Sequence, residues 1–109
     1  MKEDKEKIIQ NRSTIYQFFK ETELYFAYTE ISNRKYKVFQ IPYKWDKSYL
    51  MINDMRITDF QSVILFTNEL VVRFSKYDDW QINIPYKSIK SIAVAEDLNL
   101  GYRELHLNK

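Results

Sequence analysis

The 109-residue chain contains a single glycine, no cysteine and only one histidine, His106. Average glycine usage would supply about seven or eight glycines in a chain of this length. Dinucleotide-binding turns and phosphate-binding loops need several closely spaced glycines, so both are excluded. The missing cysteines and the lone histidine exclude thiol nucleophiles, cysteine–histidine zinc sites and histidine-based triads. These absences favour a small non-catalytic binding or regulatory protein that uses no cofactor.

Long apolar segments and a strong charge of one sign are also missing. Apolar runs such as those in residues 62–66 and 70–72 are far short of the roughly 20 residues that span a bilayer. The N-terminus mixes lysine and glutamate and lacks the apolar region of a signal peptide. The net charge of +2 is too small to indicate a nucleic-acid or membrane protein unless the bases cluster locally. Together with the absence of cysteine, these features predict a cytoplasmic protein.

Helical periodicity is confined to the start of the chain. Ile8, Ile15 and Phe19 fall on one helical stripe, and Glu3 and Lys7 form a favourable i,i+4 pair. Thr14 begins a capping-box pattern, so we expect the helix to restart there and to end near residue 21. We therefore predict one domain over residues 1–109, with a helical segment over 1–21 and a β-rich region over 22–109.

From residue 24 onward the apolar pattern alternates, as in β-strands. It predicts strands over 24–31, 35–41, 48–52, 62–66, 70–75 and 80–84, one through 89–94, and a last strand carrying Leu105 and Leu107. Turns are predicted at 32–34, 53–54, 67–69, 76–79 and 99–102, with Asn68 in the left-handed region. This spacing predicts an α+β domain that is mostly β, with an N-terminal helix and a bent antiparallel sheet or small barrel.

No set of residues predicts catalysis or metal binding. Most acidic residues fall in predicted turns, where aspartate usually caps the backbone and is solvated. Asp78 and Asp79 are adjacent, but they lack the spacing of a calcium-binding loop. The chain is therefore not expected to be an enzyme or to bind a metal.

The bases do cluster locally, in residues 33–47, which carry five bases and one acid. Aromatic residues alternate with these bases, and bases bind phosphate while rings stack on nucleotide bases. The predicted binding residues are Arg34, Lys35, Tyr36, Lys37, Tyr43, Lys44, Trp45 and Lys47. The plain alternative is a strand with Phe39 and Ile41 in the core and a solvated rim of lysines. A second segment, residues 73–90, carries a net charge of +2 and would extend the basic face if the two segments were neighbours.

Residues 62–95 resemble bacterial PH-like (GRAM-like) domains, and the likeness extends loosely over 36–107. The pattern is a hairpin containing Thr67-Asn68 and Leu70, then Ile84-Pro85-Tyr86 followed by Ile89 and Ile92. The resemblance implies a bent sheet or barrel and a protein-interaction role. PH-like domains close their barrel with a C-terminal helix, whereas this sequence ends shortly after its last predicted strand. Either the N-terminal helix replaces that helix, or the fold is another small barrel such as a PUA-like RNA-binding domain.

The resemblance also implies a bacterial source, and three functional hypotheses follow. The first is a PH-like module that binds a protein partner. The second is a regulator that binds RNA or another single-stranded nucleic acid through residues 33–47. The third, which we place last, is a peripheral binder of anionic membranes that uses the same segment.

Overall fold

The computed structural model describes residues 2–41, 49–74, 77–95 and 102–107. One helix, α1 (Lys2–Lys20), precedes nine strands and one short 3-10 helix. The elements after α1 are β1 (Tyr25–Ile31), β2 (Arg34–Gln40), β3 (Tyr49–Ile52), β4 (Met55–Thr58), β5 (Phe60–Leu65), β6 (Glu69–Phe74), β7 (Tyr77–Pro85), η1 (Tyr86–Ser88), β8 (Ser91–Ala95) and β9 (Tyr102–His106). The chain is therefore α+β and mostly β, as the sequence predicts.

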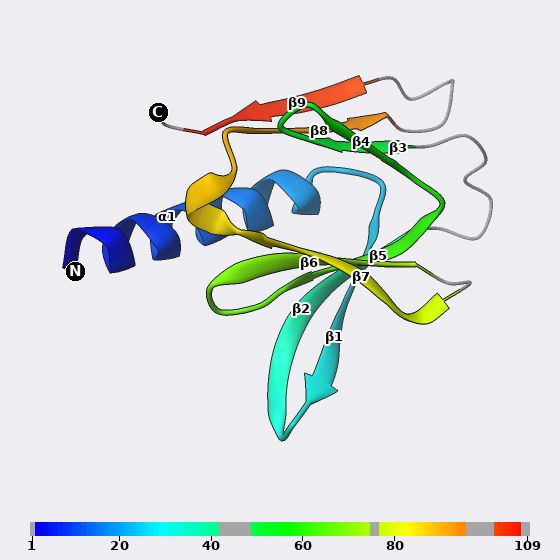
Figure 1. Cartoon of the computed structure of the whole chain (residues 1–109), viewed down its shortest axis with the longest axis horizontal. Helices are drawn as coiled ribbons and strands as arrows, with labels where there is room; N and C mark the ends of the chain where they lie inside the picture. The colour runs from blue at the N-terminus through cyan, green and yellow to red at the C-terminus, as the bar shows by residue number, and fades with distance from the viewer. Residues whose placement is uncertain (1, 42–48, 75–76, 96–101, 108–109) are drawn as a thin grey trace.

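The strands form two antiparallel sheets with the helix between them (Figure 1). The larger sheet has the order β1-β2-β5-β6-β7, and the smaller sheet has the order β4-β3-β8-β9. The chain changes sheet three times, after β2, β4 and β7, and the change between β4 and β5 occurs at Asp59, whose φ is 57°. Within the described residues the two sheets do not join into a closed barrel. The strands therefore form two separate sheets, rather than the single bent sheet or the small barrel that the sequence left open.

Helix α1 is held by the core at its C-terminal half. Ile15 and Phe19 are fully buried and belong to one cluster with residues from both sheets. The predicted restart at Thr14 is wrong, because its hydroxyl donates a 2.9 Å hydrogen bond to the Gln10 carbonyl inside a continuous helix. The helix ends where the Thr22 hydroxyl donates to the Phe19 carbonyl at 2.6 Å. The helix thus fills the space between the sheets.

Two turn predictions are corrected by the backbone. Asn68 does not adopt the left-handed region; among the described residues, the non-glycine residues that do are Ser32, Asn33, Asn53 and Asp59. The Asn68 carbonyl instead accepts a hydrogen bond from the Tyr86 amide, which fixes the turn in another conformation. Residues 77–79, predicted as part of a turn, lie in β7, where Tyr77 pairs with Phe74 of β6 across a register shift. Strand β4 is present although the sequence did not predict it.

The segment that resembles PH-like domains, residues 62–95, forms most of β5 and all of β6, β7, η1 and β8. Pro85 ends the strand as predicted, and Tyr86, Ile89 and Ile92 are all buried. Trp80 alternates with Ile82 and Ile84 along the sequence, but its side chain is 65% exposed whereas Ile84 is buried, and its ring lies 5.8 Å from that of Phe74. Of the predicted turn at 99–102, residues 99–101 lie outside the described residues, and Tyr102 begins β9.

Candidate anion-binding cleft

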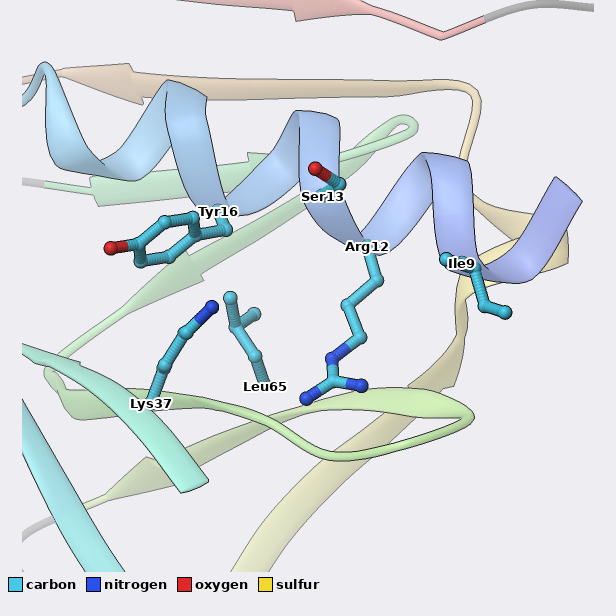
Figure 2. Close-up of a pocket in the computed structure, with 6 residues that line it drawn as sticks. All are labelled: Ile9, Arg12, Ser13, Tyr16, Lys37 and Leu65. Carbon is cyan, nitrogen blue, oxygen red and sulfur yellow. The ribbon is translucent and has the colours of Figure 1, made fainter. Parts of the chain in front are cut away.

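A cleft of about 210 Å³ lies between α1 and the larger sheet (Figure 2). It is lined by Ile9, Arg12, Ser13, Tyr16, Lys37 and Leu65. Four of these residues come from α1, one from β2 and one from β5. Figure 2 shows the side chains of Arg12 and Lys37 entering the space between helix and sheet on either side of Leu65. The cleft therefore has an apolar floor and two cationic walls.

The helical wall follows from residue spacing. Positions three and four apart lie on one face of a helix, so Ile9, Arg12, Ser13 and Tyr16 share one face of α1. The neighbouring face carries Ile15 and enters the core. Arg12 and Tyr16 are half-buried because they lie at the border between this core face and solvent.

The strand wall follows from register. Lys37 pairs with Leu65 of β5, and it shares a side of β2 with Phe39, which is fully buried under α1. Lys37 therefore points toward the helix although it is charged. Its ammonium lies 3.9 Å from the centroid of the Tyr16 ring, a cation–π contact that helps hold a half-buried cation.

An aromatic cluster supports this contact. The Tyr16 ring lies 5.7 Å from that of Phe26 and 6.0 Å from that of Phe39. The ammonium of Lys20 lies 5.1 Å from the Phe26 ring, so the border of the cluster carries a further cation. Packing against β1 and β2 thus fixes the orientation of Tyr16, and through it the position of Lys37.

The positive charge of the cleft is not neutralised by its surroundings. Among the residues that the structure describes, neither Arg12 nor Lys37 forms an ion pair with a carboxylate. Burial raises the pKa of the nearby Tyr86 hydroxyl well above its usual range; the charge of Arg12 partly opposes this rise, and Glu69 adds to it. Tyr86 is therefore neutral at physiological pH and adds no negative charge near Arg12. The carboxylate of Glu69 accepts a 2.8 Å hydrogen bond from the side-chain amide of Asn83. The arrangement is suited to bind an anion.

Other kinds of site find no support in the described parts of the chain. No group of three or more histidine, aspartate or glutamate side chains is placed to hold a metal ion there. No helix among these residues has the length and apolar character required to cross a bilayer. His106 lies on the exposed side of β9, where its ring contacts Glu104 at 2.7 Å.

The structure divides the predicted basic–aromatic segment between two sides of β2. Lys35 and Lys37 occupy the side that faces α1, whereas Arg34 and Tyr36 occupy the opposite side. Only Lys37 lines the cleft, and the Tyr36 ring lies 4.6 Å from that of Phe66. The remaining predicted residues, Tyr43, Lys44, Trp45 and Lys47, lie outside the described residues.

The second basic segment does not extend the cleft. Arg73 lies next to Val71 and Val72 on β6, and alternation places it with Val71, on the side opposite α1. This is the side of Tyr36, not of Lys37.

Sequence reasoning missed Arg12 and Tyr16, which contribute the helical wall. A signal was present, because Arg12, Tyr16 and Lys20 recur at intervals of four beside the apolar stripe. Such a basic–aromatic stripe predicts a helix face at the border of the core. It does not identify Lys37 as the residue opposite, because that depends on how the helix crosses the sheet.

Comparison with known proteins does not assign a family or a function to this chain. No protein-family model, curated protein or solved structure matches this chain.

Proposed function

We propose that this protein is a non-catalytic interaction module that binds an anionic side chain of a protein partner in the Arg12–Lys37 cleft. The observation that carries the proposal is the convergence of two half-buried cations over Leu65. Neither cation forms an ion pair with a carboxylate of the described residues. A guanidinium and an ammonium together bind carboxylates and phosphates by charge-assisted hydrogen bonds. A PH-like organisation, a bacterial source and a cytoplasmic location belong to the same proposal, supported by the sequence pattern and the absence of cysteine.

The size of the cleft supports a side chain rather than a free nucleotide as the ligand. Its volume is about 210 Å³, whereas pockets that enclose whole small molecules usually measure about 300–1,000 Å³. One carboxylate or phosphate group on an extended segment would reach both cations, and the rest of the segment would lie across the sheet.

Single-stranded RNA is the second candidate, and one specific feature favours it. Tyr28 is paired with Lys37 across β1 and β2, lies on the same side of the sheet and is 61% exposed. An exposed ring beside a cation is a stacking site for a nucleotide base. Tyr16 and Tyr36 offer less, because the first ring is covered by Lys37 and the second packs on Phe66.

Calorimetry with three probes tests the proposal. The probes are a glutamate-rich peptide with and without one phosphoserine, a pool of random single-stranded RNA, and vesicles containing anionic lipid. We expect the acidic peptide to bind, and Arg12→Gln or Lys37→Gln to raise its Kd about tenfold, as loss of a charge-assisted contact should. Arg34→Gln and Lys35→Gln remove the same charge from exposed positions on the hairpin and serve as matched controls, which should change the Kd less than about twofold.

Each other outcome has a definite meaning. Binding of RNA with a steep dependence on salt, and loss of that binding in Tyr28→Ala, would replace the first candidate with the second. Binding to vesicles alone would favour the membrane hypothesis. Equal effects of the cleft variants and the hairpin controls would show that general charge, and not the cleft, attracts the ligand.

A further inference from the structure

Strand β1 is an edge strand of unusual regularity. The edges of the two sheets are β1 and β7, and β4 and β9. The pairing of β7 with β6 is interrupted by a register shift, and β7 ends in Pro85. Strand β4 is short, with four residues. Strand β9 carries the exposed polar side chains of Arg103, Glu104 and His106. These are the usual devices that prevent a sheet edge from pairing with another chain. By contrast, all seven residues of β1 pair with β2 without a register shift, and the strand contains no proline.

The hairpin turn determines which backbone groups of β1 face the open edge. Ser32 and Asn33 form a two-residue loop with φ values of 51° and 65°, as a type I′ turn requires. The flanking residues Ile31 and Arg34 then form a hydrogen-bonded pair, and such pairs alternate along an antiparallel ladder. The amides and carbonyls of Phe26, Tyr28 and Glu30 therefore point away from β2, toward the open edge.

The same edge exposes two large aromatic side chains. Tyr25 is 69% exposed on one side of the sheet, and Tyr28 is 61% exposed on the other. A strand added at this edge would cover both rings, one on each side, and would satisfy the outward backbone groups. Figure 1 shows the β1–β2 hairpin extending from the body of the molecule, which leaves room for an added strand.

We propose that two copies of this chain associate through antiparallel pairing of their β1 strands, with the two-fold axis at Tyr28. In this register Tyr28 lies opposite the partner's Tyr28, and Phe26 lies opposite the partner's Glu30. All seven residues of β1 are paired, and the two larger sheets form one continuous ten-stranded sheet, five strands from each copy. An isologous contact of this kind closes as a dimer and does not propagate into a fibre.

Charge complementarity favours a second copy of this chain as the source of the strand that pairs with β1. The ammonium of Lys20 lies 5.1 Å from the Phe26 ring, beside the position that the partner's Glu30 takes in this register. Glu30 is exposed, and each copy contributes one such pair. Opposite charges at neighbouring positions stabilise a strand pair, and like charges destabilise it.

The other symmetric registers are less favourable. Shifting the axis to Glu30 sets two glutamates opposite one another, and shifting it to Phe26 leaves the last four residues of β1 without partners in the other β1 strand. A register centred on Ala27 or Thr29 also shortens the pairing and moves Glu30 of each copy away from the Phe26 ring. The register at Tyr28 thus combines the longest ladder with paired opposite charges.

A charge exchange tests both the contact and its register. Light scattering over a concentration series should show a mass rising from 13.4 kDa toward twice that value. Lys20→Glu and Glu30→Lys should each raise the dimer Kd about tenfold, because the symmetry applies each change twice. The double variant should recover most of the loss. Lys5→Glu and Glu6→Lys make the same charge changes near the exposed start of α1 and should leave the Kd unchanged. A wild-type chain that stays monomeric up to about 1 mM, or a double variant as weak as the singles, overturns the proposal.

A proline substitution tests the direction of the backbone groups. Tyr28→Pro removes an amide that faces the open edge, so the monomer should stay folded while the dimer is lost. Tyr28→Ala removes the same ring but keeps the amide, and it should retain measurable association. Equal association of the two variants would show that the open edge of β1 is not the contact. None of these measurements uses an anionic ligand, so they are independent of the proposed function of the cleft.

Discussion

The ammonium of Lys37 lies 3.9 Å from the centroid of the Tyr16 ring. This contact joins β2 to α1 at the point where the cleft opens, and it orients a cation that packing alone would not hold. The ring attracts the cation through its electron-rich face, and the N–H groups that point away from the ring stay available as donors. Lys37 thus remains able to bind an anion while its position is fixed.

The cation–π contact should contribute measurably to stability. Tyr16→Phe keeps an aromatic ring, so the free energy of unfolding should change by less than about 0.5 kcal/mol. Tyr16→Leu removes the ring and its contacts with Phe26 and Phe39, and it should cost about 1–3 kcal/mol. Urea unfolding measures both values.

A double-mutant cycle separates the cation from the packing. Lys37→Met keeps the length of the side chain and removes its charge. The coupling between Tyr16→Leu and Lys37→Met should be about 0.5–1 kcal/mol. A coupling near zero would contradict a stabilising role of the ammonium over the ring.

The turns at Asn33 and Asn68 should respond oppositely to glycine. Asn33 has a φ of 65°, a conformation that glycine adopts without steric cost, so Asn33→Gly should leave stability unchanged or raise it by up to about 1 kcal/mol. Asn68 does not have a positive φ, so Asn68→Gly adds backbone freedom without relieving strain and should cost about 0.5–1 kcal/mol. Thermal unfolding of the two variants compares them directly; stabilisation by Asn68→Gly would contradict the backbone conformation described for this turn.

This contrast shows where the sequence is informative and where it is not. Alternation identified most strands to within one or two residues, because the core side of each strand must be apolar. It did not identify which asparagine is left-handed, because a hydrogen bond from the distant Tyr86 amide to the Asn68 carbonyl decides that turn. Strand β4 was missed because its four residues include a single buried one, Ile57.

The cleft was partly predictable for the same reason. Lys37 was among the predicted binding residues because it lies in a local cluster of bases, which the sequence displays. Its partner Arg12 is 25 positions away on a helix, and only the crossing of α1 over the sheet brings them to one cleft. The sequence grouped Lys37 with Arg34 and Tyr36, although strand alternation places those two on the other side of β2.

Substitution of Asn53 should lower the stability of the protein more than substitution of most other polar residues. It has a φ of 56° in the turn between β3 and β4. Its side chain donates to the Ser88 carbonyl at 3.0 Å and accepts from the amides of Lys90 and Ser91 at 2.7 and 3.3 Å. Asn53→Ala loses these bonds and also the tolerance of a positive φ, so it should cost about 3 kcal/mol of unfolding free energy.

Two variants separate these contributions. Asn53→Gly loses the side-chain hydrogen bonds but accepts the positive φ, and it should be about 1 kcal/mol more stable than Asn53→Ala. Asn53→Asp keeps an acceptor for the two amides and loses only the donor, so it should cost about 1 kcal/mol. Equal stability of the alanine and glycine variants in urea would argue against the conformational part of the effect.

The Tyr86 hydroxyl should make the stability of the protein depend on alkaline pH. It donates a 2.6 Å hydrogen bond to the Phe66 carbonyl, and burial raises its pKa well above the usual value. Tyr86→Phe loses this bond and should cost about 1–2 kcal/mol near pH 7. Urea unfolding of both proteins at a series of pH values provides the measurement.

The sign of the pH effect follows from proton linkage. Above pH 10 the unfolded chain releases the Tyr86 proton while the folded chain retains it, so the unfolded state binds fewer protons and stability falls as pH rises. Phenylalanine has no such proton, and the difference in stability between wild type and Tyr86→Phe should therefore be constant below about pH 9 and shrink by about 1.4 kcal/mol at pH 11. The other eight tyrosines are common to both proteins, so subtracting the two curves largely cancels their titration. A difference that stays constant up to pH 11 would show that the hydroxyl ionises as readily in the folded protein as in the unfolded chain.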